Sequence, residues 1–423
     1  MVILAVSILV LLVIGTPIAF ALGISGAIYV LAETRLPPLV VFQRMFTGVD
    51  SFPFMAIPFF MLAGALTNVG GLADRIINFS RVLVGHLSGG LANVSIVSSM
   101  FFAGVSGSSV ADASGLGKIL IPAMKKEGYP ADFAAAINAS SSTMGIIIPP
   151  SIPMILAAVA TGLSVRELFL GGAVPGLLVG FGLLLMSTLI SRRRNYGGYR
   201  RATAVELRRA TVHAIPPLMM IVIILGGILG GIFTPTEASV VAVLYALLLG
   251  VLYRELTWQK TIEAFFDAAI SAAVVMMVIA TAALLTWLLA HSMVPQQLAL
   301  YLSELALAPV VLLMILAVTF LLAGTFLDVS PGVLLFGPIL LPVVMAVGID
   351  PVHFCVVMVF GLSIGLFTPP VGTTLIISSY LGQVPVLRVA YQGLPYLAVM
   401  SVLLFLTVLF EDIALWLPRL LFG

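Results

Sequence analysis

Two turns rich in small hydroxyl residues interrupt long apolar stretches of this sequence. The first covers residues 104–109 and reads GVSGSS, and the second covers residues 324–331 and reads GTFLDVSP. Backbone outside a regular helix cannot face lipid, so both turns are expected to line a cavity inside the protein. Hydroxyl groups and closely approaching backbone carbonyls would supply oxygen ligands for an ion there. The alternative is two ordinary surface loops, which the lack of basic residues at the turns disfavours.

A proline pair follows each turn, again inside an apolar stretch: Pro149-Pro150 in the first half and Pro369-Pro370 in the second. Adjacent prolines remove two N–H donors and disfavour helical geometry in the residue before them, so the helix must break. The freed carbonyls suit a sodium ion, and the N–H groups that start the next half-helix suit an anionic substrate. A simple kink is the alternative for one pair alone, but recurrence in both halves favours binding.

Charged residues inside apolar segments are costly and usually functional. Asp328 lies in the second turn and is a candidate for a binding role, whereas Asp112, one turn past the first, could instead cap a helix. Lys118 could neutralise a substrate carboxylate, although snorkelling towards the membrane surface is the preferred interpretation. Glu237 follows Thr234 at the spacing of a helix-start signal.

Several function classes are excluded. The single cysteine, Cys355, rules out a disulfide framework, and the four dispersed histidines show no ligand spacing for a transition metal. No phosphate-binding G-x-x-x-x-G-K-[ST] motif is present, so the chain is not expected to hydrolyse ATP. An intramembrane enzyme would need a His–Asp or paired-acid arrangement in the breaks, and none occurs there. The net charge of +2 gives no indication of nucleic-acid binding.

The elements that hold these turns are predicted to be membrane helices. Of the 423 residues, 61% are hydrophobic and 9% charged, with a mean hydropathy of +1.23, against roughly 25% charged residues in soluble domains. A cleaved signal peptide is disfavoured for the first apolar run, which is long and lacks a basic start. Paired segments at 90–127 and 305–347 are interpreted as re-entrant hairpins. Full spans are expected near residues 2–31, 53–70, 131–160, 168–190, 214–233, 237–253, 264–291, 352–380 and 389–417.

The distribution of basic residues supports this topology. Residues 191–213 contain seven arginines, and basic loops stay in the cytoplasm. With that segment inside and both hairpins re-entrant, fourteen Lys and Arg residues lie inside and four outside. Counting either hairpin as a full span would spoil this ratio. The N-terminus is then predicted to be cytoplasmic and the C-terminus periplasmic.

An internal repeat relates the two halves. With an offset of 220 residues, nine glycine or proline positions of 103–175 coincide with those of 323–395, including both proline pairs. The topology makes the two copies inverted, an architecture typical of secondary transporters. The predicted parts are an N-terminal scaffold helix and amphipathic segment (1–52), repeat one (53–190, broken helix 131–160), a basic loop with linking scaffold helices (191–263), and repeat two (264–417, broken helix 352–380).

Four motifs in order resemble the large membrane subunit of tripartite ATP-independent periplasmic (TRAP) transporters, in the ion transporter superfamily. They are AIPFFMLAG at 56–64, GVSGSSVAD at 104–112, IIPPSIP at 147–153 and TPPVG at 368–372. The likeness covers nearly the whole chain. It implies an all-α elevator-type transporter of the bacterial inner membrane that uses a sodium gradient and no other cofactor. It also implies a carboxylate substrate such as a C4-dicarboxylate or sialic acid.

The resemblance further implies partners and site residues. A small membrane subunit of the Q type, here a separate chain, and a periplasmic binding protein of the P type are expected, and the open alternative is a stand-alone carrier without a binding protein. Substrate contacts are expected from Ser108, Ser151, Asp328 and Thr374. Sodium contacts are expected in repeat one from Ser106, Ser108, Ser109, Ser142, Gly145 and Pro149, and in repeat two from Thr325, Gly365, Thr368, Pro369, Gly372 and Thr373.

Overall fold

The computed structural model describes residues 1–34, 36–304 and 307–422, and within these ranges the secondary structure is helical, with no strand. The first half contains α1 (Val2–Val13), α2 (Ile18–Glu33), α3 (Leu39–Val49), the 3-10 turn η1 (Phe52–Met55), α4 (Ala56–Val69), α5 (Leu72–Val84), α6 (Gly90–Ser106), α7 (Ser109–Lys126), α8 (Ala131–Ser142), the 3-10 turn η2 (Thr143–Ile146), α9 (Ile152–Thr161) and α10 (Val165–Arg193). The second half contains α11 (Ala204–Leu229), α12 (Pro235–Leu252), α13 (Trp258–His291), α14 (Val294–Glu304), α15 (Pro309–Gly324), α16 (Val329–Ala346), α17 (Pro351–Gly365), α18 (Thr373–Gly382), α19 (Val386–Leu409) and α20 (Asp412–Phe422).

Seven of the described helical segments are long and apolar enough to cross a membrane: Phe52–Val69, Val165–Arg193, Ala204–Leu229, Pro235–Leu252, Trp258–His291, Val329–Ala346 and Val386–Leu409. Many large apolar side chains on them are exposed, as expected for surfaces that contact lipid. The predicted all-α membrane protein is therefore confirmed, and the chain is a multi-pass membrane protein.

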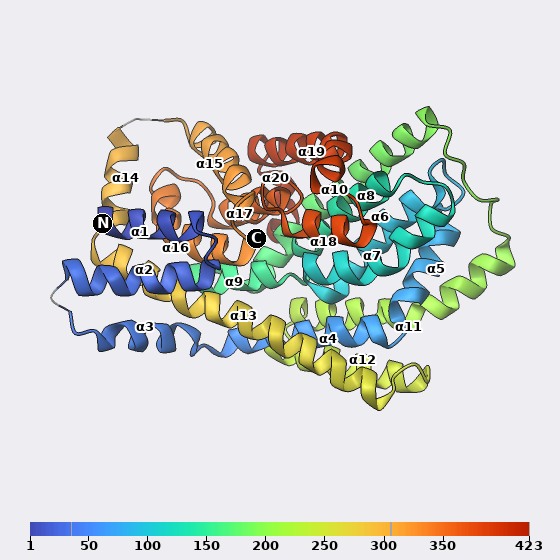
Figure 1. Cartoon of the computed structure of the whole chain (residues 1–423), viewed down its shortest axis with the longest axis horizontal. Coiled ribbons are helices and arrows are strands. Elements are labelled where there is room, and N and C mark those ends of the chain that lie inside the picture. The colour runs from blue at the N-terminus through green and yellow to red at the C-terminus, as the bar shows by residue number, and fades with distance from the viewer. Residues whose placement is uncertain (35, 305–306, 423) are drawn as a thin grey trace.

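The long helices form a group beside the two hairpins. Helix α4 packs against both α12 and α13, and α12 packs against α11. Figure 1 shows α13 running along the molecule, with both pairs of hairpin helices, α6–α7 and α15–α16, above it in this view. The broken helices lie deepest, because every side chain from Val352 to Gly365 in α17 is buried.

The same order of elements occurs twice. With the offset of 220 residues, Ser109–Lys126 of α7 maps onto Val329–Ala346 of α16, and the first residue of α8 maps onto the first residue of α17. The hairpins α6–α7 and α15–α16 thus have the same place in each half. The predicted second hairpin began at 305, and residues 305–306 lie outside the described residues.

Polar side chains start several of these helices. Thr203 with Glu206 and Thr234 with Glu237 form capping boxes at the starts of α11 and α12, in which each threonine hydroxyl accepts from the glutamate N–H and the glutamate side chain accepts from the threonine N–H. Glu237 therefore has the helix-start role that its spacing indicated.

The apolar run 2–31, predicted as one span, is two helices. The chain turns after α1 at Gly15, whose φ of +86° suits glycine, and α2 packs back against α1. The N-terminal ammonium group consequently lies 2.7 Å from a carboxylate oxygen of Glu33, at the far end of α2.

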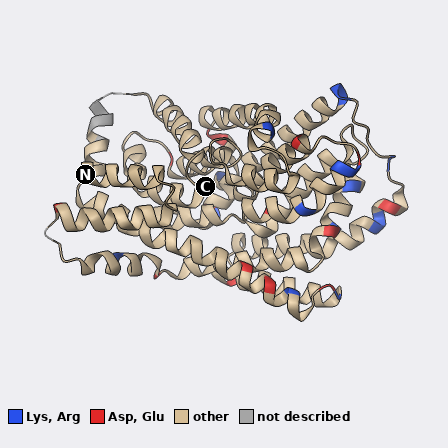
Figure 2. Ribbon diagram, in the orientation of Figure 1, with Lys and Arg blue, Asp and Glu red and all other residues tan. Residues whose placement is uncertain are grey.

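This turn removes the single crossing from which the side of the N-terminus was predicted. In Figure 1 the N-terminus lies at the end of the molecule opposite the loop between α10 and α11. Figure 2 shows that most Lys and Arg residues gather at that loop's end. The N-terminus and the basic loop therefore lie at opposite ends of the molecule.

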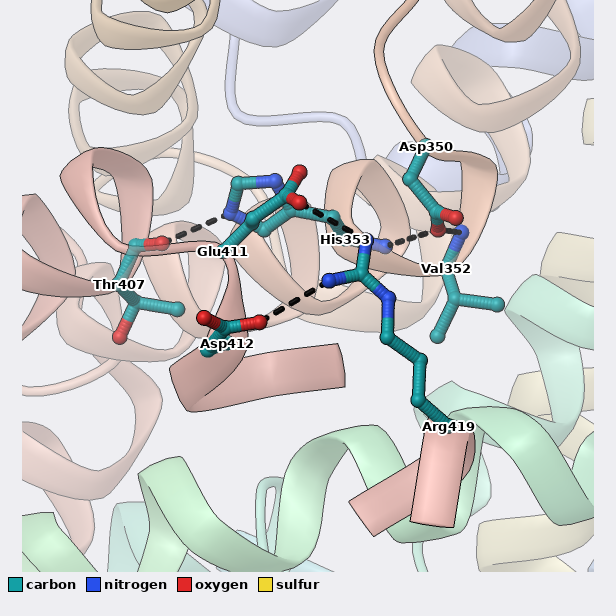
Figure 3. A network of polar contacts seen from close by, with 7 residues as sticks. All are labelled: Asp350, Val352, His353, Thr407, Glu411, Asp412 and Arg419. Atoms are coloured by element: carbon teal, nitrogen blue, oxygen red, sulfur yellow. Dashed lines mark hydrogen bonds and ion pairs between the residues drawn. The ribbon is translucent and has the colours of Figure 1, made fainter. Parts of the chain in front are cut away.

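The predicted span 389–417 is also interrupted. Helix α19 ends at Leu409, Phe410 is extended, and α20 starts at Asp412. Figure 3 shows the contacts that hold this corner, where Arg419 forms ion pairs with Glu411 and Asp412 at 2.8 and 2.9 Å. His353 of α17 bonds through Nε2 to the carbonyl of Thr407 in α19 at 2.7 Å, which fastens the second broken helix to the corner.

Candidate functional site

The first hairpin tip is tied to the first helix break. Gly107 at the tip has a φ of +62°, and Ser108 caps α7 by accepting a hydrogen bond from the Ala111 N–H at 3.4 Å. The carbonyl of Gly107 accepts from the N–H of Ile152, the first residue of α9, at 3.1 Å. The tip therefore meets the point where the second half-helix begins.

The first break lies between α8 and α9 and contains Pro149-Pro150, whose peptide bond is cis. Ser151 stabilises it by donating to the carbonyl of Ile146 at 2.6 Å and accepting from the N–H of Met154 at 3.3 Å. Ser142 donates to the carbonyl of Asn138, one turn earlier in α8, at 2.7 Å. The proline pair thus interrupts the helix as the sequence predicted.

Asp112 lies beneath this break and is not a helix cap. It is fully buried, and its Oδ1 accepts a hydrogen bond from the Ser106 hydroxyl. Its Oδ2 has no hydrogen-bond partner among the described residues. A Cβ at Gly145 would lie 2.5 Å from that oxygen, so only glycine lets the break approach the carboxylate this closely.

The second tip repeats this arrangement with different side chains. The carbonyl of Thr325 accepts from the N–H of Val371, just after Pro369-Pro370, at 3.1 Å. Asp328 caps α16 by accepting from the Ser330 N–H at 3.5 Å, and the Thr373 hydroxyl lies 3.5 Å from its other oxygen.

Backbone carbonyls converge at the second break. A Cβ at Gly372 would lie 2.9 and 3.0 Å from the carbonyl oxygens of Thr368 and Leu366, so both oxygens point towards this residue. The Leu366 carbonyl also accepts from the N–H and the hydroxyl of Thr374, at 3.0 and 2.9 Å. Gly365 packs directly on Gly324 at the end of α15.

The two broken helices contact each other. The Asn138 side-chain amide of α8 donates to the Ser378 hydroxyl of α18 at 2.8 Å and to the Ala113 carbonyl of α7 at 3.0 Å. The Thr374 hydroxyl also donates to the carbonyl of Ala139 at 3.1 Å. Residues of the two halves are therefore joined directly behind the tips.

A cavity of about 660 Å³ lies where the two tips meet. It is lined by the first tip and α7, by the start of α16 with Asp328 and Ser330, and by one face of α13. A separate hollow of about 640 Å³ at the end of α18 lies away from both tips and has no charged lining residue. Only the first of these two cavities therefore has charged groups that could bind an ion or a polar ligand.

Three of the predicted site residues line this cavity: Ser108, Ser109 and Asp328. The others lie at the tips and breaks behind it, namely Ser106, Ser142, Gly145, Pro149, Ser151, Thr325, Gly365, Thr368, Pro369, Gly372, Thr373 and Thr374. Ser151 and Thr374 are fully buried, and their hydroxyls donate to backbone carbonyls.

The sequence interpretation missed several polar residues of the cavity. Asp267 and Ser271 of α13 and Asn68 of α4 all line it, and so does Lys118, which had been interpreted as snorkelling. Asp267 could have been found as a charged residue inside the apolar run 264–291. Nothing in the sequence pattern placed Asn68 beside the first tip.

Comparison with known proteins agrees with this architecture. The sequence profile described as "Tripartite ATP-independent periplasmic transporter, DctM component" matches residues 5–413. The solved structure of the YdaH transporter from Alcanivorax borkumensis aligns with a TM-score of 0.65 and 15% identity, covering 90% of this chain and 89% of that one. This likeness concerns the fold alone.

Two relatives align with this chain over almost their full lengths. The sialic acid TRAP transporter large permease protein SiaM of Vibrio cholerae is 39% identical, over 98% of this chain and 97% of that protein. The C4-dicarboxylate TRAP transporter large permease protein DctM of Pseudomonas aeruginosa is 36% identical, over 94% of each. This chain therefore belongs to the DctM family, the large permease component of tripartite ATP-independent periplasmic transporters.

Proposed function

We propose that this transporter subunit couples a sodium gradient to the import of an organic acid across the bacterial inner membrane. The acid would be delivered by a periplasmic binding protein of the P type, and a separate small subunit of the Q type would complete the membrane complex. The observation that carries the proposal is the cavity in which both hairpin tips meet, lined by hydroxyl groups and by charged side chains. Membership of the permease family makes it a transporter and not an enzyme.

The substrate is proposed to be a carboxylate of the sialic acid or C4-dicarboxylate type, because the two relatives described above carry those names. A volume of about 660 Å³ is in the usual range for sites that enclose a small molecule. Ser108 and Asp328 are the proposed substrate contacts that line it. Ser151 and Thr374 would act indirectly, by holding the breaks in place.

The sodium ions are proposed to bind at the two breaks, one behind each tip. For the first site the ligands would come from Ser106, Ser108, Ser109, Ser142, Gly145 and Pro149. For the second they would come from Thr325, Gly365, Thr368, Pro369, Gly372 and Thr373. The Thr368 carbonyl, which points towards Gly372, supports the second site, since carbonyl oxygens replace the hydration shell of alkali cations.

The two halves are proposed to be inverted repeats that work as an elevator, in which the hairpins and broken helices move together. The tie between Asn138 and Ser378 supports a common movement. The basic loop between α10 and α11 is placed in the cytoplasm. The N-terminus, which lies at the opposite end of the molecule, is proposed to be periplasmic. The C-terminus is also proposed to be periplasmic.

Uptake into proteoliposomes tests this function. The chain is reconstituted with or without its proposed small subunit and binding protein, and uptake of labelled sialic acid and succinate is measured with an inward sodium gradient. We expect uptake only with all three components and sodium. Full-rate uptake by the chain alone would support the alternative, a stand-alone carrier. Equal uptake in potassium would contradict sodium coupling.

A further inference from the structure

Lys118 is the one cation among the described residues that line the cavity. The two anionic residues there are Asp267 and Asp328. Lys118 makes no hydrogen bond or ion pair with any part of the chain that the structure describes. An unpaired ammonium group therefore faces a cavity that already contains two carboxylates.

The position of Lys118 along α7 argues against simple snorkelling. The helix ends at Lys126, eight residues later, which corresponds to about 12 Å along the axis. That distance exceeds the length of one lysine side chain, so the ammonium group cannot reach the end of the helix where Lys125 and Lys126 lie. Lys118 is exposed although it lines the cavity, so its ammonium group stays accessible to a ligand that enters from solvent.

Two polar residues, Asn68 and Ser114, line the cavity near Lys118. Ala111, Ser114, Gly115 and Lys118 recur three or four residues apart and so share one face of α7, which lines the cavity below the first tip. Asn68 of α4 occupies the space that a side chain at Gly115 would fill, and its Oδ1 is buried with no partner among the described residues. Lys118 therefore lies one helical turn from Gly115, beside which the Asn68 Oδ1 has no hydrogen-bond donor among the described residues.

Among the described lining residues, Lys118 alone can attract an anionic group by its charge. An organic acid that enters this cavity meets two carboxylates and a single ammonium group. We propose that Lys118 binds a carboxylate of the transported acid, below the contacts that the two tips supply. This inference rests on the proposed function and adds to it the residue that selects for an anion.

The test compares three variants of the complete tripartite system in proteoliposomes, with sialic acid or succinate as the probe. Lys118→Met removes the charge, Lys118→Arg retains it, and Lys126→Met removes a charge from the same helix outside the cavity. We expect Lys118→Met to raise KM roughly 10- to 100-fold with little change in kcat, as for the loss of one charge-assisted hydrogen bond. Lys118→Arg should stay closer to the wild type, and Lys126→Met should match it.

A binding measurement separates this role from a structural one. The acid should raise the melting temperature of the wild type but not of Lys118→Met, whose melting temperature without the acid should be unchanged. If Lys118→Met has the KM of Lys126→Met, the inference is overturned. If the wild type takes up neither acid, the proposed function is contradicted and the inference falls with it.

Discussion

Replacing Gly365 by alanine should separate the second hairpin from the second broken helix. A Cβ at Gly365 would overlap the backbone of Gly324, and no side-chain movement can relieve a clash with backbone. A Cβ at Gly324 would in turn lie 2.9 Å from the Cα of Leu362, so the close approach involves both helices. The Cβ at Gly365 itself would lie 2.0 Å from the carbonyl carbon of Gly324. Since carbon–carbon contact needs about 3.5–4.0 Å, α15 and α17 must move apart by about 1.5–2 Å.

The expected cost follows from that movement. Overpacking of this kind costs about 1–3 kcal/mol, and unfolding 423 residues releases roughly 0.9 kcal/mol/K of entropy. The melting temperature should therefore fall by only about 1–3 °C. Uptake should fall far more, on the order of 100-fold, because a displacement of about 1 Å disorders a binding geometry.

Gly226→Ala is the matched control, since a Cβ there would meet nothing within 4 Å. It should keep full uptake and gain up to about 1 kcal/mol from helix propensity. Melting curves of the purified protein and sodium-driven uptake measure both quantities. If Gly365→Ala behaves like Gly226→Ala in both assays, the close packing of α15 on α17 is refuted.

Two of the three further predictions concern the proposed ion and substrate contacts, and the third concerns the contact between the two broken helices. Asp328→Ala should abolish uptake while the protein stays folded, although the lost helix cap should lower its stability by about 1 kcal/mol. Asp328→Asn retains a good helix cap, so it should lose uptake without that loss of stability. Normal uptake in either variant would remove the carboxylate from the site. Sodium at about 100 times its dissociation constant should stabilise the purified protein in thermal melts by about 2.7 kcal/mol for each occupied site. An equal effect of potassium would contradict two sodium sites. Asn138→Ala should lower the stability measured in melting experiments by about 1–3 kcal/mol, because the Ser378 hydroxyl and the Ala113 carbonyl lose a buried donor. Thr319→Ala is the control and should change stability little, since this exposed hydroxyl bonds only within its own helix.

The helix breaks and the repeat could be predicted from the sequence because they follow from local chemistry. Two adjacent prolines end a helix wherever they occur, and glycine with serine forms a turn that lipid cannot cover. The same reasoning failed at residues 2–31, where a turn at Gly15 folds α2 back on α1. Hydropathy shows that such a run is apolar, but it does not show whether the run crosses once or folds back, because both arrangements bury the same side chains.

What only the tertiary structure decided is which polar groups share the cavity. Lys118 on α7 and Asp267 on α13 are separated by 149 residues, and both sit in ordinary apolar helices. Whether these two side chains reach the same cavity depends on the rotation and the shift of each helix against the other. Side-chain packing between distant segments sets both. The sequence by itself determined that two hydroxyl-rich tips and two helix breaks exist. The packing of the two halves brought Ser108 and Asp328 to one cavity, and it turned Ser151 and Thr374 towards backbone carbonyls instead.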